Sequence, residues 1–389
     1  MILQTTLGTG LVLAQQGGDS VHLLNASAAE LWQLYQVSDD EVEARPLIQK
    51  LRVDYGLSKE TASSQVEMLL LHWQQNGLVK ASLEQPDTFF SHSCDWVVVP
   101  AFPKTAQSMT LTVKLAGLCF GLIIEDAQLT QRLTVLLSSV RVVDSECLAH
   151  HLVLTGDVIQ WQLSVNVQPE TTGQGLENAL TCVLHTLIDL ACQAEERLLV
   201  VHGAGLRLTD NRGLLLIAPG GSGKTTLATA LNAQGYGLLS DDVVPVTMTG
   251  ELLGLGTPIC LKSGSWPILM PYRADLTNTQ SLERYGQTVR YLPPLGNGHD
   301  GSIRLGLLLF PRYQPGNVPH CKALSPEEAF QYIIEAEAVI RNLTQAKLDA
   351  LANWVSSVPA YALSYPDLDS ALALVQQQVD HRSPTEIEL

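Results

Sequence analysis

Hydrophobic and polar residues alternate in three short stretches at the start of the chain, ILQTT, GLVLAQQ and SVHLLN. Because glycine-rich turns separate these stretches, a period of two predicts three short strands. The period then becomes helical. It predicts one helix in ASAAELWQLY behind Asn25 or Ser27 as its N-cap, a second in ARPLIQKLRVDY that ends at Gly56, and a third that follows Ser58 and stops by Gly77.

After the three predicted helices, the hydrophobic pattern is first lost and then becomes strand-like. LEQPDTFFSHSCD has no periodicity and indicates a linker, after which strand-like stretches such as MTLTVKL, FGLIIE and VIQWQLSV follow. A helix over residues 175–195 precedes the strand LLVVHG, and Ser325 with Pro326 is typical of a helix start. We therefore expect an α/β protein, α+β overall, with three parts: residues 1–82, a linker over 83–95, and residues 96–389 around a core at about 198–340.

Composition narrows the classes of function. A chain of 389 residues with 46% hydrophobic residues is long enough for two or three packed domains. Its 39 acidic residues against 23 basic ones give a net charge of −16, which argues against a nucleic-acid partner. The longest apolar run, residues 115–124, is too short to cross a bilayer. Seven scattered cysteines without a CxxC pair, and no signal peptide, indicate a cytoplasmic protein with no membrane partner.

The order of three strands and three helices, with LLNASAAELW at the junction and NGLV at the end, resembles the PqqD family. These winged-helix-like peptide chaperones recognise the leader segment of a ribosomally made precursor peptide. The resemblance implies that a leader adds a strand beside Val21, His22, Leu23 and Leu24 and contacts the third helix. A winged helix that binds nucleic acid is an alternative for the same helices, but the acidic charge disfavours it.

A second motif predicts a phosphate-binding loop. APGGSGKT, residues 218–225, fits the P-loop pattern except for Ala218 at its first position, and it stands between a strand and a helix. Its glycines let backbone N–H groups point into one concavity, the lysine places a charge on the outer phosphates, and the Thr225 hydroxyl can ligate Mg²⁺. The predicted nucleotide-binding residues are Gly220, Gly221, Ser222, Gly223, Lys224, Thr225 and Thr226.

Two aspartates follow the next strand, in YGLLSDD. Two carboxylates beside the phosphates can divide the work: one holds Mg²⁺ and the other accepts the proton of an attacking hydroxyl. A solvated turn is the alternative. We favour Asp241 as the base, although the sequence hardly separates it from Asp242, and we expect the metal at Thr225, Asp242 and Asp241.

VHGAGL, GLLLIAPGGSGKTTLATAL and GYGLLSDDVVPV, in that order, resemble the HPr kinase/phosphorylase family, which shares its core with phosphoenolpyruvate carboxykinase. The resemblance implies a role for His202 near the γ-phosphate, where the residue alone would read as a core histidine. It also makes Lys262 and Arg290 candidates to stabilise the transferred phosphoryl group, with surface roles equally open. The phosphorylase signature has no clear counterpart, and a carboxykinase site is poorly supported.

The two resemblances together predict an ATP-dependent kinase that phosphorylates a Ser or Thr hydroxyl of a precursor peptide, with ATP and Mg²⁺ as cofactors. ATP and GTP cannot be told apart, and a homo-oligomer is compatible because HPr kinases are commonly hexameric. Two alternatives remain open. The protein could be an ATP-gated chaperone that hands the peptide to another enzyme, or a kinase for a small molecule with the first domain as a scaffold.

Overall fold

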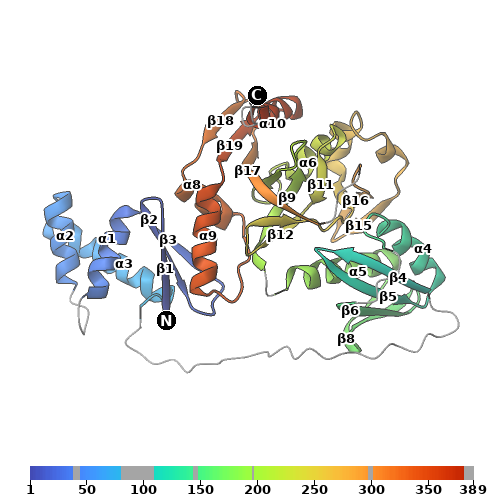
Figure 1. Cartoon of the computed structure of the whole chain (residues 1–389), viewed down its shortest axis with the longest axis horizontal. Helices are drawn as coiled ribbons and strands as arrows, with labels where there is room; N and C mark the ends of the chain where they lie inside the picture. The colour runs from blue at the N-terminus through green and yellow to red at the C-terminus, as the bar shows by residue number, and fades with distance from the viewer. Residues whose placement is uncertain (38–43, 80–108, 143–147, 195–196, 297–300, 381–389) are drawn as a thin grey trace, which may run out of the picture. The chain divides into compact units, whose positions relative to one another are not determined.

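A computed structural model describes residues 1–37, 44–79, 109–142, 148–194, 197–296 and 301–380 (Figure 1). The chain divides into two compact units. Unit 1 comprises Met1–Val98 and Ile340–Ser356, and unit 2 comprises Val99–Val339 and Ser357–Leu389. The predicted linker over residues 83–95 lies outside the described residues. Residues 340–356 differ from the expected division, which placed them with the second domain.

Unit 1 contains the predicted three strands followed by three helices. The strands form an antiparallel sheet in the order β1-β2-β3, in which β3 is an edge strand. The side chain of Asn25 accepts a hydrogen bond from the Ala28 N–H at 2.9 Å, Gly56 ends the second helix with φ 67°, and Ser58 caps the third. The elements are β1 (Ile2–Leu7), β2 (Gly10–Gln15), β3 (Val21–Leu24), α1 (Ala26–Val37), α2 (Arg45–Tyr55) and α3 (Lys59–Gln75).

Both faces of the central strand β2 are buried. Leu11 and Leu13 point to the helices and join a core that includes Trp32 and Trp73, whose rings meet edge to face at 5.0 Å. Strand alternation places Val12, which is 1% exposed, on the other face. Residues 340–356, with α9 (Gln345–Ser357), belong to this unit. They are joined to it by backbone hydrogen bonds between Leu343 and the turn after β2.

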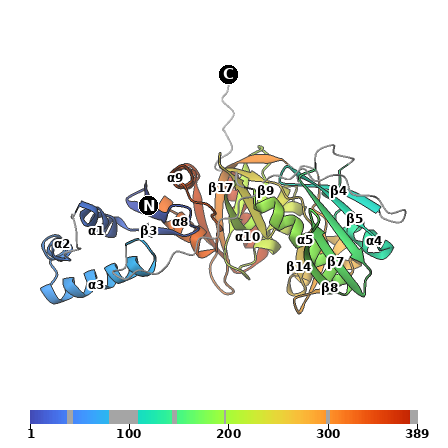
Figure 2. The same ribbon diagram turned by 90° about the horizontal axis from the view of Figure 1, so that it is seen from below.

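Unit 2 begins with a five-stranded sheet in the order β4-β5-β6-β7-β8. Figure 2 shows helix α5 beside these strands, and the side chains of α4 and α5 complete the core of this layer. The polar strand β8 was not predicted, because QPETTGQ lacks apolar alternation. The elements are β4 (Met109–Leu115), β5 (Leu118–Ile124), α4 (Ala127–Leu136), β6 (His150–Gly156), β7 (Gln160–Val165), β8 (Gln168–Gln174) and α5 (Leu176–Cys192).

Two long strands of an eight-stranded sheet, β9 and β17, each change their pairing partners along their length. The second half of β9 pairs with β10 and β11, whereas its first half pairs with β12. The start of β17 pairs with β13, and its remainder runs parallel to β10 and β19. The elements are β9 (Arg197–Arg207), β10 (Gly213–Ile217), α6 (Lys224–Ala233), β11 (Gly237–Ser240), β12 (Val243–Thr247), β13 (Glu251–Leu253), β17 (Ser302–Tyr313), β18 (His320–Ala323) and β19 (Ala360–Tyr365).

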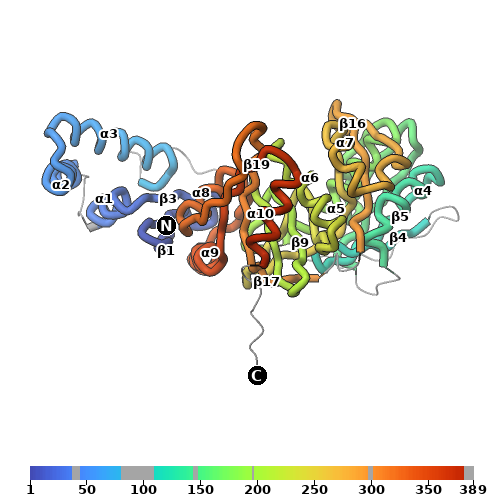
Figure 3. The backbone as a smooth tube through the Cα atoms, turned by 90° about the horizontal axis from the view of Figure 1, so that it is seen from above, coloured from blue at the N-terminus to red at the C-terminus, as the bar shows by residue number. Residues whose placement is uncertain are grey.

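Helices cover the sheet that contains β10. Helices α6 and α10 contact one another, and Figure 3 shows α10 beside β19. Leu227, Leu231 and Val375 are buried in the core they share with the strands. The start of α8 is the predicted one, since Ser325 and Glu328 form a reciprocal capping box. The two further helices are α8 (Pro326–Glu335) and α10 (Leu368–Asp380).

A smaller sheet, β14-β16-β15, follows β13 in the sequence. Tyr285 and Gly286 join β15 to β16, and both have positive φ, as a two-residue type I′ hairpin turn requires. This tight turn fixes the direction of Arg284, the last residue of β15. The elements are β14 (Ile259–Lys262), η1 (Ser263–Ser265), α7 (Trp266–Leu269), η2 (Ala274–Asn278), β15 (Ser281–Arg284) and β16 (Gln287–Leu292).

Candidate functional site

The buried strand β10 runs into a glycine loop, residues 218–223, that leads directly into α6. Gly221 and Gly223 have φ values of 79° and 91°, a region that other residues enter only with strain. Gly223 is the N-cap of α6 and offers no side chain to its first turn. The free N–H groups of that turn, together with the positive end of the helix, form an arrangement that favours anions.

Lys224, the first residue of α6, is buried and folds back over the glycine loop. Its ammonium donates hydrogen bonds to the carbonyl oxygens of Ala218 and Pro219, the latter at 3.0 Å. Burial lowers the pKa of Lys224 below its usual value, and the nearby charge of Lys262 acts in the same direction while Asp241 opposes it. The lysine charge therefore lies inside the loop that the sequence predicted to hold phosphates.

Asp241 follows β11 and lies against the start of α6. Its Oδ1 accepts a hydrogen bond from the Thr225 hydroxyl at 3.1 Å, and the residue is only 6% exposed. Burial, reinforced by the charge of Asp242, raises the pKa of Asp241 to about 7. A carboxylate in this position carries a negative charge that its surroundings only partly compensate, so it would gain from a cation.

Asp242 has a different environment. It occupies the left-handed region, with φ 78°, and its carbonyl accepts a hydrogen bond from the Gly203 N–H at 3.1 Å. Its carboxylate is about half exposed and lies 3.5 Å from Nδ1 of His202. A non-glycine residue in this conformation is uncommon, and such strain is found preferentially at functional sites. With this backbone conformation, the Asp241 side chain points into the protein and the Asp242 side chain points to solvent.

Arg284 completes the surroundings of Asp242, and sequence reasoning missed it. Its Nη2 lies 3.8 Å from Oδ2 of Asp242 and 2.7 Å from Nε2 of His185, while its Nη1 donates to the sulfur of Cys260 at 3.2 Å. Because arginine can only donate, Nε2 of His185 is the acceptor, and burial beside this cation lowers the pKa of His185. Nδ1 of His185 contacts the Tyr285 hydroxyl at 3.1 Å.

The two other cations predicted from the sequence differ in their surroundings. Lys262 is exposed at the end of β14, and its charge is felt by Lys224. Arg290 lies over the ring of Trp266 at 4.1 Å and donates a hydrogen bond to the Leu276 carbonyl at 2.7 Å. These contacts account for Arg290 as a packing residue, so its role toward a phosphoryl group stays a prediction, as does that of Lys262.

The predicted peptide-binding strand β3 pairs with β2 along one edge. Leu24 is buried in the core beneath the helices, and alternation places His22 on the same face. Burial and the nearby charge of His72, in the last turn of α3, lower the pKa of His22. His22 of β3 and His72 of α3 therefore lie near one another, and a leader bound beside them stays a prediction.

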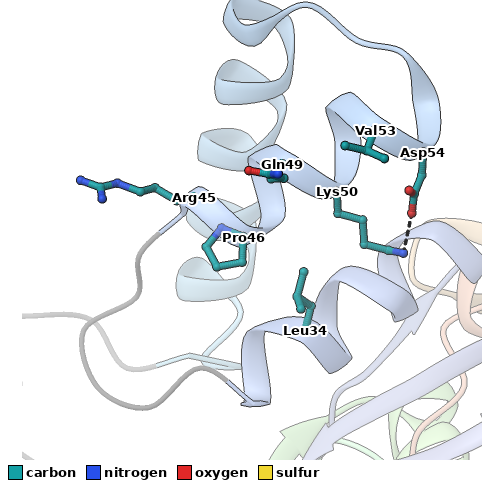
Figure 4. A pocket seen from close by; sticks show the side chains of 7 residues that line it. All are labelled: Leu34, Arg45, Pro46, Gln49, Lys50, Val53 and Asp54. Atoms are coloured by element: carbon teal, nitrogen blue, oxygen red, sulfur yellow. Dashed lines mark hydrogen bonds and ion pairs between the residues drawn. The ribbon is translucent and has the colours of Figure 1, made fainter.

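A separate hollow of about 580 Å³ opens between α1 and α2 in unit 1 (Figure 4). The ammonium of Lys50 pairs there with Asp54 at 2.8 Å and with Glu30 at 2.9 Å. No site residue predicted from the sequence lines it. Its lining residues are Leu34, Arg45, Pro46, Gln49, Lys50, Val53 and Asp54.

The comparisons with known proteins give a family match for unit 1 and none for unit 2. No curated protein matches the chain. Among solved structures, the HPr(Ser) kinase/phosphatase from Coxiella burnetii aligns with 47% of this chain and 95% of its own, at 11% identity and a TM-score of 0.23. A TM-score this low does not establish a shared fold. No helix in the described part of the chain is both long and apolar enough to span a bilayer. Residues 10–79 match the family model described as coenzyme PQQ synthesis protein D (PqqD), so unit 1 contains a PqqD-family domain.

Proposed function

We propose that this protein is an ATP-dependent kinase that phosphorylates a Ser or Thr hydroxyl of a ribosomally made precursor peptide, which residues 1–82 recruit. One arrangement carries the proposal. Beside the glycine loop, a buried aspartate bonded to Thr225 is followed directly by an exposed aspartate next to His202. Phosphoryl transfer needs these parts: a phosphate cradle, a metal-binding carboxylate and an acceptor for the hydroxyl proton.

Mg²⁺ fits the inner part of the site. It prefers oxygen ligands and commonly takes one or two carboxylates together with substrate phosphates. The Thr225 hydroxyl and the Asp241 carboxylate, 3.1 Å apart, supply two such oxygens. Among the described residues, no group of three or more His, Cys, Asp and Glu side chains could hold a metal. When bound, Mg²⁺ would neutralise charge on the phosphates.

The contacts favour exchanging the roles first given to the two aspartates. Asp241 is buried and bonded to Thr225, which suits the metal ligand, whereas Asp242 is exposed and suits the base. In the proposed step the Asp242 carboxylate accepts the hydroxyl proton as the hydroxyl oxygen bonds to the γ-phosphorus. The bond from the γ-phosphorus to the bridging oxygen breaks and leaves ADP. Lys224 would exchange its two loop carbonyls for phosphate oxygens when ATP binds.

Peptide recruitment follows from the PqqD-family domain. An extended leader would pair with the edge of β3 that no described strand occupies, and its alternate side chains would meet His22 and helix α3. A leader held in this way keeps the rest of the peptide at a local concentration of roughly millimolar for a short connection. The kinase site could then act on a segment that it binds only weakly.

Intact-mass spectrometry tests the proposal. The precursor peptide encoded beside the gene is incubated with the full chain, ATP and Mg²⁺, and we expect a gain of one phosphate group. Lys224→Ala and Asp242→Asn should abolish the gain. Asp369→Asn is the matched control, because its side chain can still accept the hydrogen bond from Tyr272. A peptide that binds tightly but stays unmodified would refute the kinase and favour the ATP-gated chaperone.

A further inference from the structure

Two tyrosines lie beside the glycine loop on the side away from the aspartates. Strands β10, β17 and β19 run parallel, so their carboxyl ends meet at one edge of the sheet. β10 leads into the glycine loop, β17 ends with Tyr313, and β19 ends with Tyr365. A Cβ atom placed on Gly223 would lie 3.3 Å from the Tyr365 hydroxyl and 3.8 Å from Cβ of Tyr313. Ligands of open α/β sheets bind at such carboxyl edges.

The Tyr365 hydroxyl is a buried polar group. The residue is 3% exposed, and its hydroxyl has no hydrogen-bond partner within the part of the chain that the structure describes. The hydroxyl of Ser222, inside the glycine loop, is buried and unpartnered in the same way. A buried hydroxyl without a partner is costly, and both groups adjoin the N-terminal end of α6. A phosphate oxygen at that helix end would accept hydrogen bonds from both.

Tyr313 offers a different group. Its ring packs near that of Tyr365, with centroids 6.3 Å apart, yet the residue is 50% exposed. A tyrosine held against a neighbour with one side open to solvent is suited to stack on a flat aromatic ligand. Every nucleobase has such a face, so stacking binds a base without selecting among bases.

The order of the strands indicates how a bound nucleotide would be oriented in the site. The sheet runs β11-β9-β10-β17-β19, so the glycine loop after β10 lies between the aspartates that follow β11 and the tyrosines that end β17 and β19. We propose that Tyr313 and Tyr365 form the nucleoside side of the nucleotide site. Tyr365 donates to a phosphate, Tyr313 stacks on the base, and the terminal phosphate points to Asp241 and Asp242. This inference rests on the nucleotide site of the proposed function.

Calorimetry with two ligands separates these contacts. The full chain is titrated with Mg²⁺–ATP and with Mg²⁺–tripolyphosphate, which has the phosphates but no nucleoside. Tyr313→Ala should weaken ATP binding about tenfold and leave tripolyphosphate unchanged. Tyr365→Phe keeps the ring, removes only the hydroxyl, and should weaken both ligands about fivefold. Tyr332→Ala, which removes a tyrosine of α8 that packs on Phe310, is the matched control and should change neither.

The outcomes are distinct. If the wild-type chain binds both ligands but Tyr313→Ala weakens both equally, or neither, the nucleoside contact is refuted while the proposed kinase stands. If Tyr365→Phe leaves both affinities unchanged, the phosphate contact is refuted. If the wild-type chain binds neither ligand, the proposed function fails and this inference fails with it. Thermal unfolding of Tyr365→Phe without ligand should show no loss of stability, because the removed hydroxyl bonds to none of the described residues.

Discussion

At the scale of single residues, the buried carboxyl of Asp241 should lower the folding stability of the chain at neutral pH, although the proposed kinase activity needs it. Its pKa rises from 3.8 to about 7 on folding, so between these pH values the folded chain holds a proton that the unfolded chain has lost. Stability therefore falls as pH rises through this window, by about 4 kcal/mol at most, and levels off above pH 7. Asp241→Asn cannot ionise, so we expect it to be more stable than the wild type at pH 8 and inactive as a kinase.

Thermal unfolding without metal and nucleotide, at pH 5 and at pH 8, measures this effect. The stability gap between Asp241→Asn and the wild type should be several-fold larger at pH 8, where the destabilisation is complete. Asp369→Asn, an exposed aspartate, should show no such widening. A gap of equal size at both pH values would mean that the Asp241 carboxyl ionises normally in the folded chain.

A second prediction at the scale of single residues concerns Arg284. Its guanidinium reaches Asp242, His185 and Cys260 together, which a lysine cannot do with one ammonium. We expect Arg284→Lys to lower kcat roughly 10- to 100-fold by releasing the proposed base, with KM for ATP nearly unchanged. Arg132→Lys, on helix α4 with its guanidinium bonded to Gln280, is the control. A rise in KM for ATP without a change in kcat would show that Arg284 serves nucleotide binding instead.

At the scale of elements, the sequence predicted what depends on neighbouring residues. The helix caps at Ser58 and Ser325 could be predicted from the sequence because their hydrogen-bond partners lie three residues away. The glycine loop and the aspartate pair could be recognised in the sequence because each is one short, contiguous stretch. Arg284 was not, because its approach to Asp242 depends on a hairpin from another sheet. Tyr365 was not, because only the parallel pairing of β19 with β17 brings it to the loop.

The same reasoning explains why the sequence did not group residues 340–356 with unit 1. Their place in unit 1 depends on backbone bonds from Gly17 to Leu343 and from Leu343 to Gly18, at 2.8 and 3.0 Å. Leu343 is fully buried, so we expect Leu343→Ala to destabilise unit 1 by about 2–5 kcal/mol. Amide hydrogen exchange in β1 and β2 should accelerate accordingly.

Val339→Ala provides the control for this element. Val339 precedes the segment, and its side chain is 44% exposed, so shortening it should leave exchange in β1 and β2 unchanged. Unaltered exchange in Leu343→Ala would show that the β1–β2 sheet holds together without the segment. The PqqD-family domain of this chain would then be stable on residues 1–79 alone.

At the scale of the whole molecule, the chain joins a PqqD-family domain to a unit that we propose to be a kinase. A tether accelerates a reaction only while the substrate is dilute, because its effect is to raise a local concentration. The proposed mechanism therefore makes a quantitative distinction between two peptides. A precursor with its leader should be phosphorylated at low concentration, whereas the same core segment without the leader should need a far higher concentration.

We expect kcat/KM for the leader-bearing peptide to exceed that for the core peptide by on the order of 10²- to 10⁴-fold. The values of kcat at saturation should be similar, because in the proposed mechanism the leader only raises the local concentration of the acceptor segment. Free leader added in excess should inhibit the first reaction by competition and leave the second unchanged, which is the internal control. Equal kcat/KM values for both peptides would mean that the kinase site itself recognises the acceptor segment, and the PqqD-family domain would then need another role.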